Sequence, residues 1–136
     1  MQQEFLIKNI LIVEDNPVNQ KVMQRLIKIF GHNSETLADG NLVIDYVKAN
    51  KPDLILMDVQ LIEFSGVDLT REIKDDENLK SIPVIMVTAF ATVDDKEKII
   101  TNSKCDDFLA KPFLPKELEE KILRFFPVNQ IEWNKK

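Results

Sequence analysis

The chain has 136 residues and a formal net charge of −5, with 44% hydrophobic and 30% charged residues. Such a length is typical of one domain, and the acidic charge argues against binding to a nucleic-acid backbone. No apolar run approaches the ~18 residues of a membrane-spanning helix. The single cysteine, Cys105, excludes an internal disulfide and a cysteine-built zinc site, and it fits a reducing compartment. We therefore expect a cytoplasmic protein without membrane insertion or direct nucleic-acid contact.

Short apolar runs alternate with longer amphipathic stretches along the chain. Continuous short apolar runs are typical of strands covered on both faces, whereas apolar residues spaced three and four apart indicate helices. In chain order, the predicted elements are a strand at 10–13, a helix at 17–30, a weak strand at 34–38, a helix at 40–51, a strand at 54–57, a helix at 67–74, a strand at 83–87, a helix at 94–101, a strand at 108–110 and a helix from 115 to 126.

Each helix is predicted to bury one face. Pro17 and Gly31 mark the two ends of the first helix, because proline suits the first helical position and glycine suits a left-handed cap. The predicted buried face of this helix comprises Val18, Val22, Leu26 and Ile29, widened by Met23, Ile27 and Phe30. The predicted inward residues of the last two helices are Ile99, Ile100, Leu118, Ile122, Phe125 and Phe126.

Strands that alternate with helices predict an α/β fold with a parallel sheet between two helical layers. The smallest doubly wound solution with five strands and five helices is the flavodoxin-like strand order 2-1-3-4-5. This order puts the weak second strand at an edge, which suits its polar pattern. The expected domain spans residues 8–126, between an N-terminal extension at 1–7 and a C-terminal tail at 127–136.

Polar side chains follow four of the five predicted strands. Glu14 and Asp15 end the first strand, Asp58 the third, Thr88 the fourth and Lys111 the fifth. The carboxyl ends of parallel strands lie at one edge of the sheet, and ligands of doubly wound folds bind there. We therefore expect these residues to meet in one pocket.

Three carboxylates in one pocket can all stay ionised if a hard divalent cation lies among them. Oxygen ligands favour Mg²⁺, and the pocket has no cysteine or histidine that would favour zinc. An aspartate can accept a phosphoryl group, and a metal ion with a lysine supplies the charge neutralisation that this transfer needs. Asp58 is the expected acceptor because it ends the central strand. Asp15 and Glu14 are the expected metal ligands, and the hydroxyl of Thr88 would meet a phosphoryl oxygen.

With these residues in this order, the sequence resembles the response-regulator receiver domains of bacterial two-component signalling, the CheY-like superfamily. The resemblance rests on Ile-Leu-Ile-Val-Glu-Asp-Asn at 10–16, Leu-Ile-Leu-Met-Asp at 54–58, Val-Thr-Ala at 87–89, Lys-Pro-Phe at 111–113 and Gly66. It covers roughly residues 8–126. Within the family, the chain looks most like stand-alone receivers of the DivK type.

The resemblance implies a role for each matching residue. Asp58 would take the phosphoryl group from a sensor histidine kinase or a histidine phosphotransfer protein, and Lys111 would pair with that group. Gln60 would add its backbone carbonyl to the Mg²⁺ ligands Glu14, Asp15 and Asp58. Thr88 and Phe108 would act as a switch. The resemblance also implies a cis peptide bond between Lys111 and Pro112.

The implied output is a protein partner that contacts the face formed by the fourth helix, the fifth strand and the fifth helix. In this interpretation the chain is a phosphoryl-accepting switch, with at most self-dephosphorylation, rather than an enzyme. The family usually has a proline four positions after the acceptor, where this chain has Ile62. Proline would fix the backbone angle φ and remove an N–H group, so Ile62 is expected to leave the loop freer.

Three other functions compete with this interpretation. A small Mg²⁺-dependent phosphatase with an aspartyl-phosphate intermediate usually has a second aspartate two positions after the nucleophile, where this chain has Gln60. A nucleotide or flavin binder would need a glycine-rich loop after the first strand. A pseudo-receiver that is never phosphorylated stays open because of Ile62. His32 is interpreted as a turn residue far from the pocket, not as a phosphoryl carrier.

Overall fold

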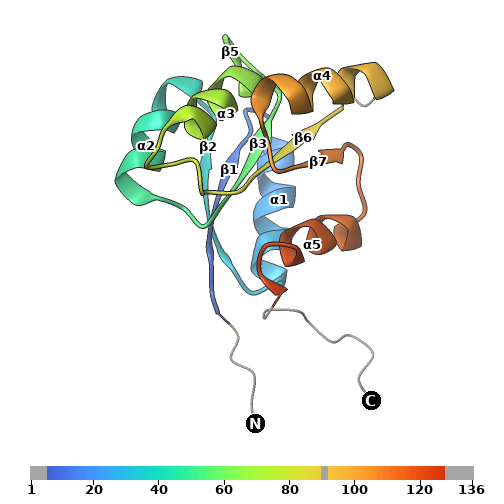
Figure 1. Ribbon diagram of the computed structural model, residues 1–136. Coiled ribbons are helices and arrows are strands. Elements are labelled where there is room, and N and C mark those ends of the chain that lie inside the picture. Colours follow the sequence, from blue (N-terminus) through green and yellow to red (C-terminus); the bar gives the residue numbers. More distant parts are fainter. Residues whose placement is uncertain (1–5, 90–91, 128–136) are drawn as a thin grey trace, which may run out of the picture.

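The computed structural model describes residues 6–89 and 92–127 of the chain (Figure 1). Five parallel strands form one sheet in the order β2-β1-β3-β6-β7, which confirms the predicted order. The strands are β1 (Asn9–Val13), β2 (Asn33–Leu37), β3 (Leu54–Asp58), β6 (Val84–Thr88) and β7 (Asp107–Ala110). β2 starts and ends one residue earlier than the predicted strand.

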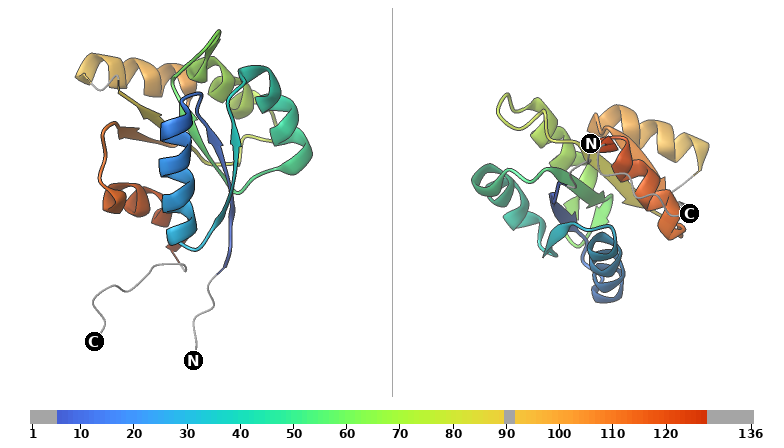
Figure 2. Two further views of the ribbon diagram at one scale, coloured as in Figure 1. Left: turned by 180° about the vertical axis from the view of Figure 1, so that it is seen from behind. Right: turned by 90° about the horizontal axis from the view of Figure 1, so that it is seen from below.

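Helices cover both faces of the sheet, as expected for three layers. On one face lie α2 (Val43–Asn50), α3 (Gly66–Asp75) and α4 (Val93–Ser103), and on the other lie α1 (Pro17–Ile29) and α5 (Pro115–Leu123). Figure 2 shows α1 in front of the sheet when the molecule is seen from behind. A short 3₁₀ helix, η1 (Gly40–Leu42), precedes α2.

The strands divide their side chains between two apolar clusters because successive residues point to opposite faces. Leu11 and Met57 belong to the cluster under α2, α3 and α4, whereas Ile12 and Leu56 belong to the cluster under α1 and α5. All residues of β3 and β6 are buried, but β2 is partly exposed. A continuous apolar run therefore marks a central strand here, and the polar pattern of β2 marks an edge.

The ends of α1 follow the predicted signals. The Asn16 side chain accepts hydrogen bonds from the backbone amides of Val18 and Asn19, with Pro17 at the first helical position. Gly31 follows the helix with a φ of 90°, a left-handed conformation that glycine adopts without strain. These local contacts determine where α1 begins and where the chain turns back toward β2.

The predicted buried face of α1 is partly wrong. Met23 and Ile27 are buried, but the side chains of Val18, Val22 and Ile29 are 69%, 50% and 55% exposed. The apolar residues of this helix span more of its circumference than one sheet can cover, so only the stripe through Met23 and Ile27 packs inward. In α4, Ile99 is buried as predicted, whereas Ile100 is 37% exposed.

A small hairpin between β3 and α3 was not predicted. Its strands β4 (Gln60–Leu61) and β5 (Phe64–Ser65) are antiparallel, and they are too short to show an apolar alternation in the sequence. The turn between them contains Glu63, whose φ is 66°. The ring of Phe64 packs against Gly40, where a Cβ atom would lie only 2.4 Å from it. The hairpin is therefore held against η1.

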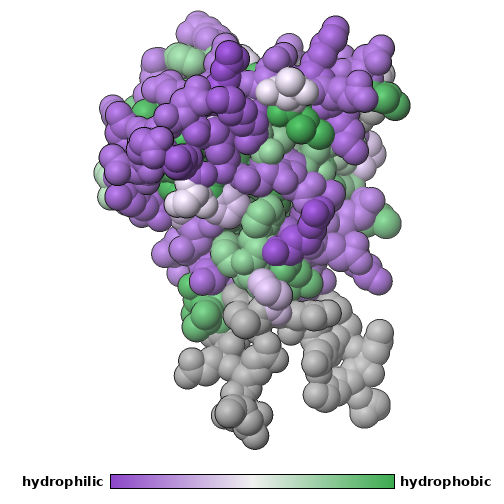
Figure 3. Space-filling model, in the orientation of Figure 1, coloured by the Kyte–Doolittle hydropathy of each residue, from purple (hydrophilic) through white to green (hydrophobic). Residues whose placement is uncertain are grey.

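Among the described residues, no helix is long and apolar enough to span a membrane. Figure 3 shows a mostly hydrophilic face on which hydrophobic residues form separate patches. The expected extension at 1–7 and tail at 127–136 fall mostly outside the described residues, so these domain boundaries stay predictions.

Candidate phosphoryl-acceptor and metal site

Three carboxylates meet at the carboxyl end of the sheet. Each of Glu14, Asp15 and Asp58 offers an oxygen, and these oxygens lie within 4.8 Å of one another. Glu14 and Asp58 are buried and Asp15 is half-buried. They come from the ends of β1 and β3, which pair in parallel, so the sheet register brings residues far apart in sequence to one point.

One cation lies between two of these acids. The Nζ atom of Lys111, in the loop after β7, donates hydrogen bonds to Glu14 Oε1 at 2.7 Å and to Asp58 Oδ2 at 3.1 Å. The Lys111 side chain is only 20% exposed. The other oxygen of Asp58, Oδ1, accepts a hydrogen bond from the Gln60 amide at 3.0 Å. The site therefore holds three carboxylates against one ammonium group.

The pKa shifts in this group follow from burial and from the shared lysine. Burial raises the pKa of the Asp58 carboxyl above its ordinary value, although the Gln60 amide and the Lys111 charge act in the opposite direction. Burial by itself would lower the pKa of Lys111, but hydrogen bonds and negative charges from Glu14 and Asp58 outweigh it and raise that pKa. Lys111 therefore stays protonated at neutral pH, whereas burial disfavours the charged form of Asp58, which a further cation would stabilise.

Gly66 allows the loop after β3 to lie close to the end of that strand. A Cβ atom at this position would lie 1.9 Å from the backbone oxygen of Asp58, which no side chain could tolerate. The Gly66 amide also donates to the carbonyl of Val59 at 2.7 Å. The close approach of α3 to the end of β3 thus depends on a glycine at this position.

The other predicted site residues, Thr88, Phe108 and Gln60, differ in where they lie relative to the acidic cluster. Thr88, the last residue of β6, is buried, and its carbonyl accepts a hydrogen bond from the Lys111 amide at 2.9 Å. Phe108 on β7 is buried, and it lies on the same sheet face as the helices α2, α3 and α4. Gln60 contacts Asp58 through its amide, whereas a metal contact of its carbonyl stays a prediction. The Lys111–Pro112 peptide bond is cis, as the resemblance implied.

One group at the site was missed by the sequence reasoning. The backbone amide of Ile62 donates a hydrogen bond to Asp15 Oδ2 at 2.8 Å. The loop with Ile62 was expected to be freer than one with proline, but its N–H group ties the hairpin to the acidic cluster. The only sequence signal was the absence of proline itself, because a backbone donor leaves no other mark in a sequence.

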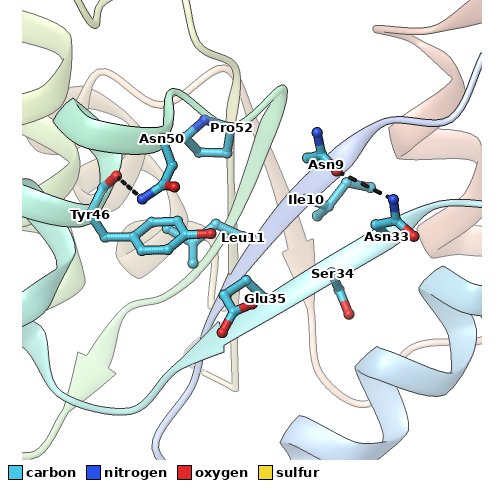
Figure 4. Close-up of a pocket in the computed structure, with 9 residues that line it drawn as sticks. All are labelled: Asn9, Ile10, Leu11, Asn33, Ser34, Glu35, Tyr46, Asn50 and Pro52. Carbon is cyan, nitrogen blue, oxygen red and sulfur yellow. Dashed lines mark hydrogen bonds between the residues drawn. The ribbon is translucent and has the colours of Figure 1, made fainter.

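Two further cavities lie near the sheet. An apolar groove of about 450 Å³ lies beside the acids, between α1 and the loop after β7, and its lining residues include Val22, Leu26, Lys111, Pro112 and Phe113. A second cavity, of about 290 Å³, lies at the amino end of β1 and β2, with Tyr46 and Asn50 on one side and Asn9 and Asn33 on the other (Figure 4). The second cavity has a single carboxylate and no cation, so it is no alternative phosphoryl site.

The donor set of the acidic cluster fits a hard divalent cation. All its side-chain ligands are carboxylates, and hard cations such as Mg²⁺ prefer oxygen ligands and keep several waters. The half-buried Asp15 leaves a route for such waters. No cysteine or histidine belongs to the group, so a zinc-type donor set is absent from it.

Comparisons with known proteins agree with this geometry. Residues 10–123 match the model of the response regulator receiver domain family. The chain is 42% identical over 113 residues to proteins named polar-differentiation response regulator DivK from Brucella anthropi and Brucella ovis, covering 82% of this chain and 91% of each relative. The chain therefore belongs to the receiver domain family of two-component response regulators, as the sequence motifs predicted.

Solved structures support the same assignment. The receiver domain of sensor histidine kinase PA1611 from Pseudomonas aeruginosa PAO1 is 36% identical with a TM-score of 0.82, covering 90% of this chain and 99% of that one. Its structure has a magnesium ion coordinated in the active site cleft. The chemotaxis protein CheY4 from Vibrio cholerae, 22% identical with a TM-score of 0.80 over 88% of this chain and 99% of that one, shares the fold. The predicted fold class is confirmed, and the expected Mg²⁺ site has both its acidic cluster and a precedent in a relative.

Proposed function

We propose that this protein is a phosphoryl-accepting switch in which Asp58 takes a phosphoryl group from a phosphohistidine donor. The phosphorus–nitrogen bond of the donor breaks, a bond forms between phosphorus and a carboxylate oxygen of Asp58, and the histidine nitrogen leaves with the electron pair of the broken bond. The observation that carries the proposal is the contact between Asp58 and Lys111 at 3.1 Å inside a group of three carboxylates.

The residues around Asp58 divide the work of this transfer. Glu14, Asp15 and Asp58 would hold Mg²⁺, together with the Gln60 carbonyl. A bound magnesium ion supplies positive charge next to the phosphoryl oxygens. Lys111 pairs with a phosphoryl oxygen. Its ammonium group, which contacts Glu14 and Asp58 in the structure, already lies next to the carboxylate that receives the phosphoryl group. Because phosphoryl transfer depends mainly on positioning and charge, this set of groups is sufficient for it.

The switch part of the proposal rests on Thr88 and Phe108. Thr88 follows Val87, the β6 residue that pairs with Asp58, and Phe108 pairs with Met86 on the far side of β6. A phosphoryl group on Asp58 would draw the Thr88 hydroxyl toward it, and Phe108 would move into the space that Thr88 leaves.

The output surface of the proposal is the α4–β7–α5 face. α4 buries few side chains, and Val93 and Ile100 are exposed on it. A helix with few buried contacts needs little free energy to shift, which suits an element that reports the phosphorylation state to a protein partner.

We further propose that the donor protein docks on the apolar groove between α1 and the loop after β7. The groove includes Lys111 among its lining residues, so a protein seated there would present its histidine near Asp58. Val18 and Val22 extend this apolar surface along α1. A Val22→Glu variant should lose phosphoryl uptake from a phosphohistidine protein and keep uptake from a small phosphodonor.

The single free cysteine also supports a cytoplasmic location.

The proposal is tested by weighing the intact protein after incubation with a small-molecule phosphodonor, with and without Mg²⁺. We expect one added phosphoryl group per chain, only with Mg²⁺, and none on Asp58→Asn. Asp53→Asn is the matched control, since Asp53 lies at the other end of the sheet, where it accepts a hydrogen bond from the Asn9 amide.

Two outcomes would contradict the proposal. Continuous release of many phosphates per chain would make the protein a phosphatase with an aspartyl-phosphate intermediate. A folded, magnesium-loaded protein that takes up no phosphoryl group would make it a pseudo-receiver.

A further inference from the structure

We infer that the backbone amide of Ile62 is a positioning group for the metal ligand Asp15, and that the β4–β5 hairpin exists to hold this amide in place. The inference rests on the proposed magnesium site and adds to it a residue that contacts neither metal nor phosphoryl group. It follows from a hydrogen bond between two segments 47 residues apart.

The geometry leaves Asp15 free to bind a cation while the amide holds it. The Ile62 N–H group donates to Oδ2 of Asp15 at 2.8 Å. A carboxylate has about four acceptor positions on its two oxygens, so one hydrogen bond leaves Oδ1 and part of Oδ2 available. Hydrogen bonds of this kind fix the orientation of a metal-binding carboxylate, and their loss typically weakens metal binding by about 10- to 100-fold.

Asp15 has particular need of such a partner. Glu14 is held by Lys111 and by the Asn16 amide, and Asp58 by Lys111 and the Gln60 amide. Among the described residues, the Asp15 carboxylate accepts its hydrogen bond from the Ile62 amide. Asp15 is also the least buried of the three acids, so without that donor its side chain would have more rotamers available.

The hairpin that carries the amide is anchored at its other side. Phe64, opposite Leu61 in the hairpin, packs its ring against Gly40 at the start of η1. Any side chain at position 40 would collide with that ring, because an added Cβ atom would lie 2.4 Å from its Cγ atom. The path from Gly40 through Phe64 to the Ile62 amide therefore connects η1 to the acidic cluster.

Substitution of Ile62 separates the amide from the side chain. The Ile62 side chain is 73% exposed, so Ile62→Ala removes little packing and keeps the N–H group. Ile62→Pro removes the N–H group and puts a methylene near Asp15. The backbone accepts this proline, because only the second turn residue, Glu63, has a positive φ, and proline is common at the first position of such a turn.

The first experiment measures Mg²⁺ affinity of the three proteins by titration calorimetry, with thermal unfolding as the check on folding. We expect Ile62→Pro to bind Mg²⁺ at least about tenfold more weakly than the natural chain. Ile62→Ala should stay within about twofold of it, as expected for an exposed side chain. Equal affinities of the proline variant and the natural chain would overturn the inference. If the natural chain bound no Mg²⁺, the metal site of the proposed function would fail first, and this inference with it.

A cycle with Gly40 tests the anchor. Gly40→Ala should weaken Mg²⁺ binding in the natural background by displacing Phe64, and it should have no further effect in the Ile62→Pro background. Additive effects would show that Gly40 acts independently of the amide and would overturn the role of the hairpin.

The second experiment needs no proline and therefore does not depend on the folding of that variant. Hydrogen exchange of the Ile62 amide, followed by NMR, should become faster in Asp15→Ala, while the Gly66 amide, which donates to Val59, keeps its rate. Saturating Mg²⁺ should leave the Ile62 amide protected. Loss of protection on adding Mg²⁺ would mean that the metal competes with the amide for Asp15, and it would overturn positioning.

Discussion

At the amino end of the sheet, buried charges are matched by groups of the neighbouring loops, whereas at the carboxyl end three acids lie near one lysine, which pairs with two of them. The Lys74 side chain is 8% exposed; its Nζ atom contacts Asp106 and donates to the carbonyls of Lys80 and Ile82. Asp106 in turn accepts a hydrogen bond from the Val84 amide.

The contrast separates structural charge from functional charge. A charge that completes the hydrogen bonds of nearby backbone needs no further ligand, so the amino end is stable as it stands. The three carboxylates near Lys111 leave an excess of negative charge in a partly buried place, which favours the binding of a cation. Variants at the carboxyl end should therefore change chemistry more than stability, and variants at the amino end the reverse.

The strongest test of the contrast removes the shared lysine. Lys111→Ala should lower the rate of phosphoryl uptake from a small phosphodonor roughly 100-fold, the usual effect of losing one charge-stabilising donor. Time-resolved intact mass measures this rate. Lys121→Ala is the matched control, because Lys121 is also paired with an aspartate, Asp107, but lies in α5. A similar loss of rate in both variants would contradict a specific role of Lys111.

Gly66 lies at the carboxyl end of the sheet, but its role there is structural, because it packs against the backbone of Asp58. Gly66→Ala should lower the free energy of unfolding by about 3 kcal/mol or more, because its Cβ atom would collide with the Asp58 backbone. Urea unfolding measures the change. In Ser65→Ala, which loses only the side-chain cap of α3, the expected loss is about 1 kcal/mol. Equal small losses in both variants would show that the loop relaxes without the glycine.

Lys74 tests the amino end. Lys74→Met keeps the long aliphatic part of the side chain and leaves Asp106 and the carbonyl of Ile82 without their cation. We expect the free energy of unfolding to fall by about 2 to 3 kcal/mol, in the range for the loss of a charged hydrogen-bond partner. Phosphoryl uptake by the folded protein should keep its natural rate. A slower rate at full folding would mean that the two ends are coupled.

The smallest expected effect is a pH dependence at the amino end. Nδ1 of His32, which is 7% exposed, accepts a hydrogen bond from the Lys8 amide. Burial and the Lys8 charge lower the pKa of His32 below its ordinary value of 6.5, against the opposing charge of Asp53. A lowered pKa in the folded state contributes stability that is present above 6.5 and is lost as the pH falls through the folded pKa.

The measurement is urea unfolding at several pH values from about 7.5 down to about 5, the range in which a histidine titrates. His32→Asn is the control, because its side-chain oxygen also accepts a hydrogen bond but does not titrate in this range. The natural chain should lose more stability over this range than the variant. Parallel pH curves would show that His32 does not contribute.

Much of the fold and of the site could be predicted from sequence because both depend on local patterns. The apolar runs that end in Asp15, Asp58 and Thr88 identify parallel strands, and parallel strands bring their carboxyl ends together whatever the details of packing. Lys111 could be placed at the same edge because it directly follows the fifth strand of the sheet, β7. His32 directly follows the turn at Phe30 and Gly31. The burial of its ring depends on Lys8 and Phe126, which are far away in the sequence and which no local pattern identifies.

By itself, the sequence determined the strand order, the edge position of β2 and the group of Glu14, Asp15, Asp58 and Lys111, since hydrophobic period and strand length are properties of neighbouring residues. The tertiary structure alone decided which side of α1 stays exposed, that a hairpin follows β3, and that the Ile62 amide reaches Asp15. These features arise from contacts between residues far apart in the chain, such as Phe64 on Gly40. Their free energies depend on distances that only the packed molecule defines.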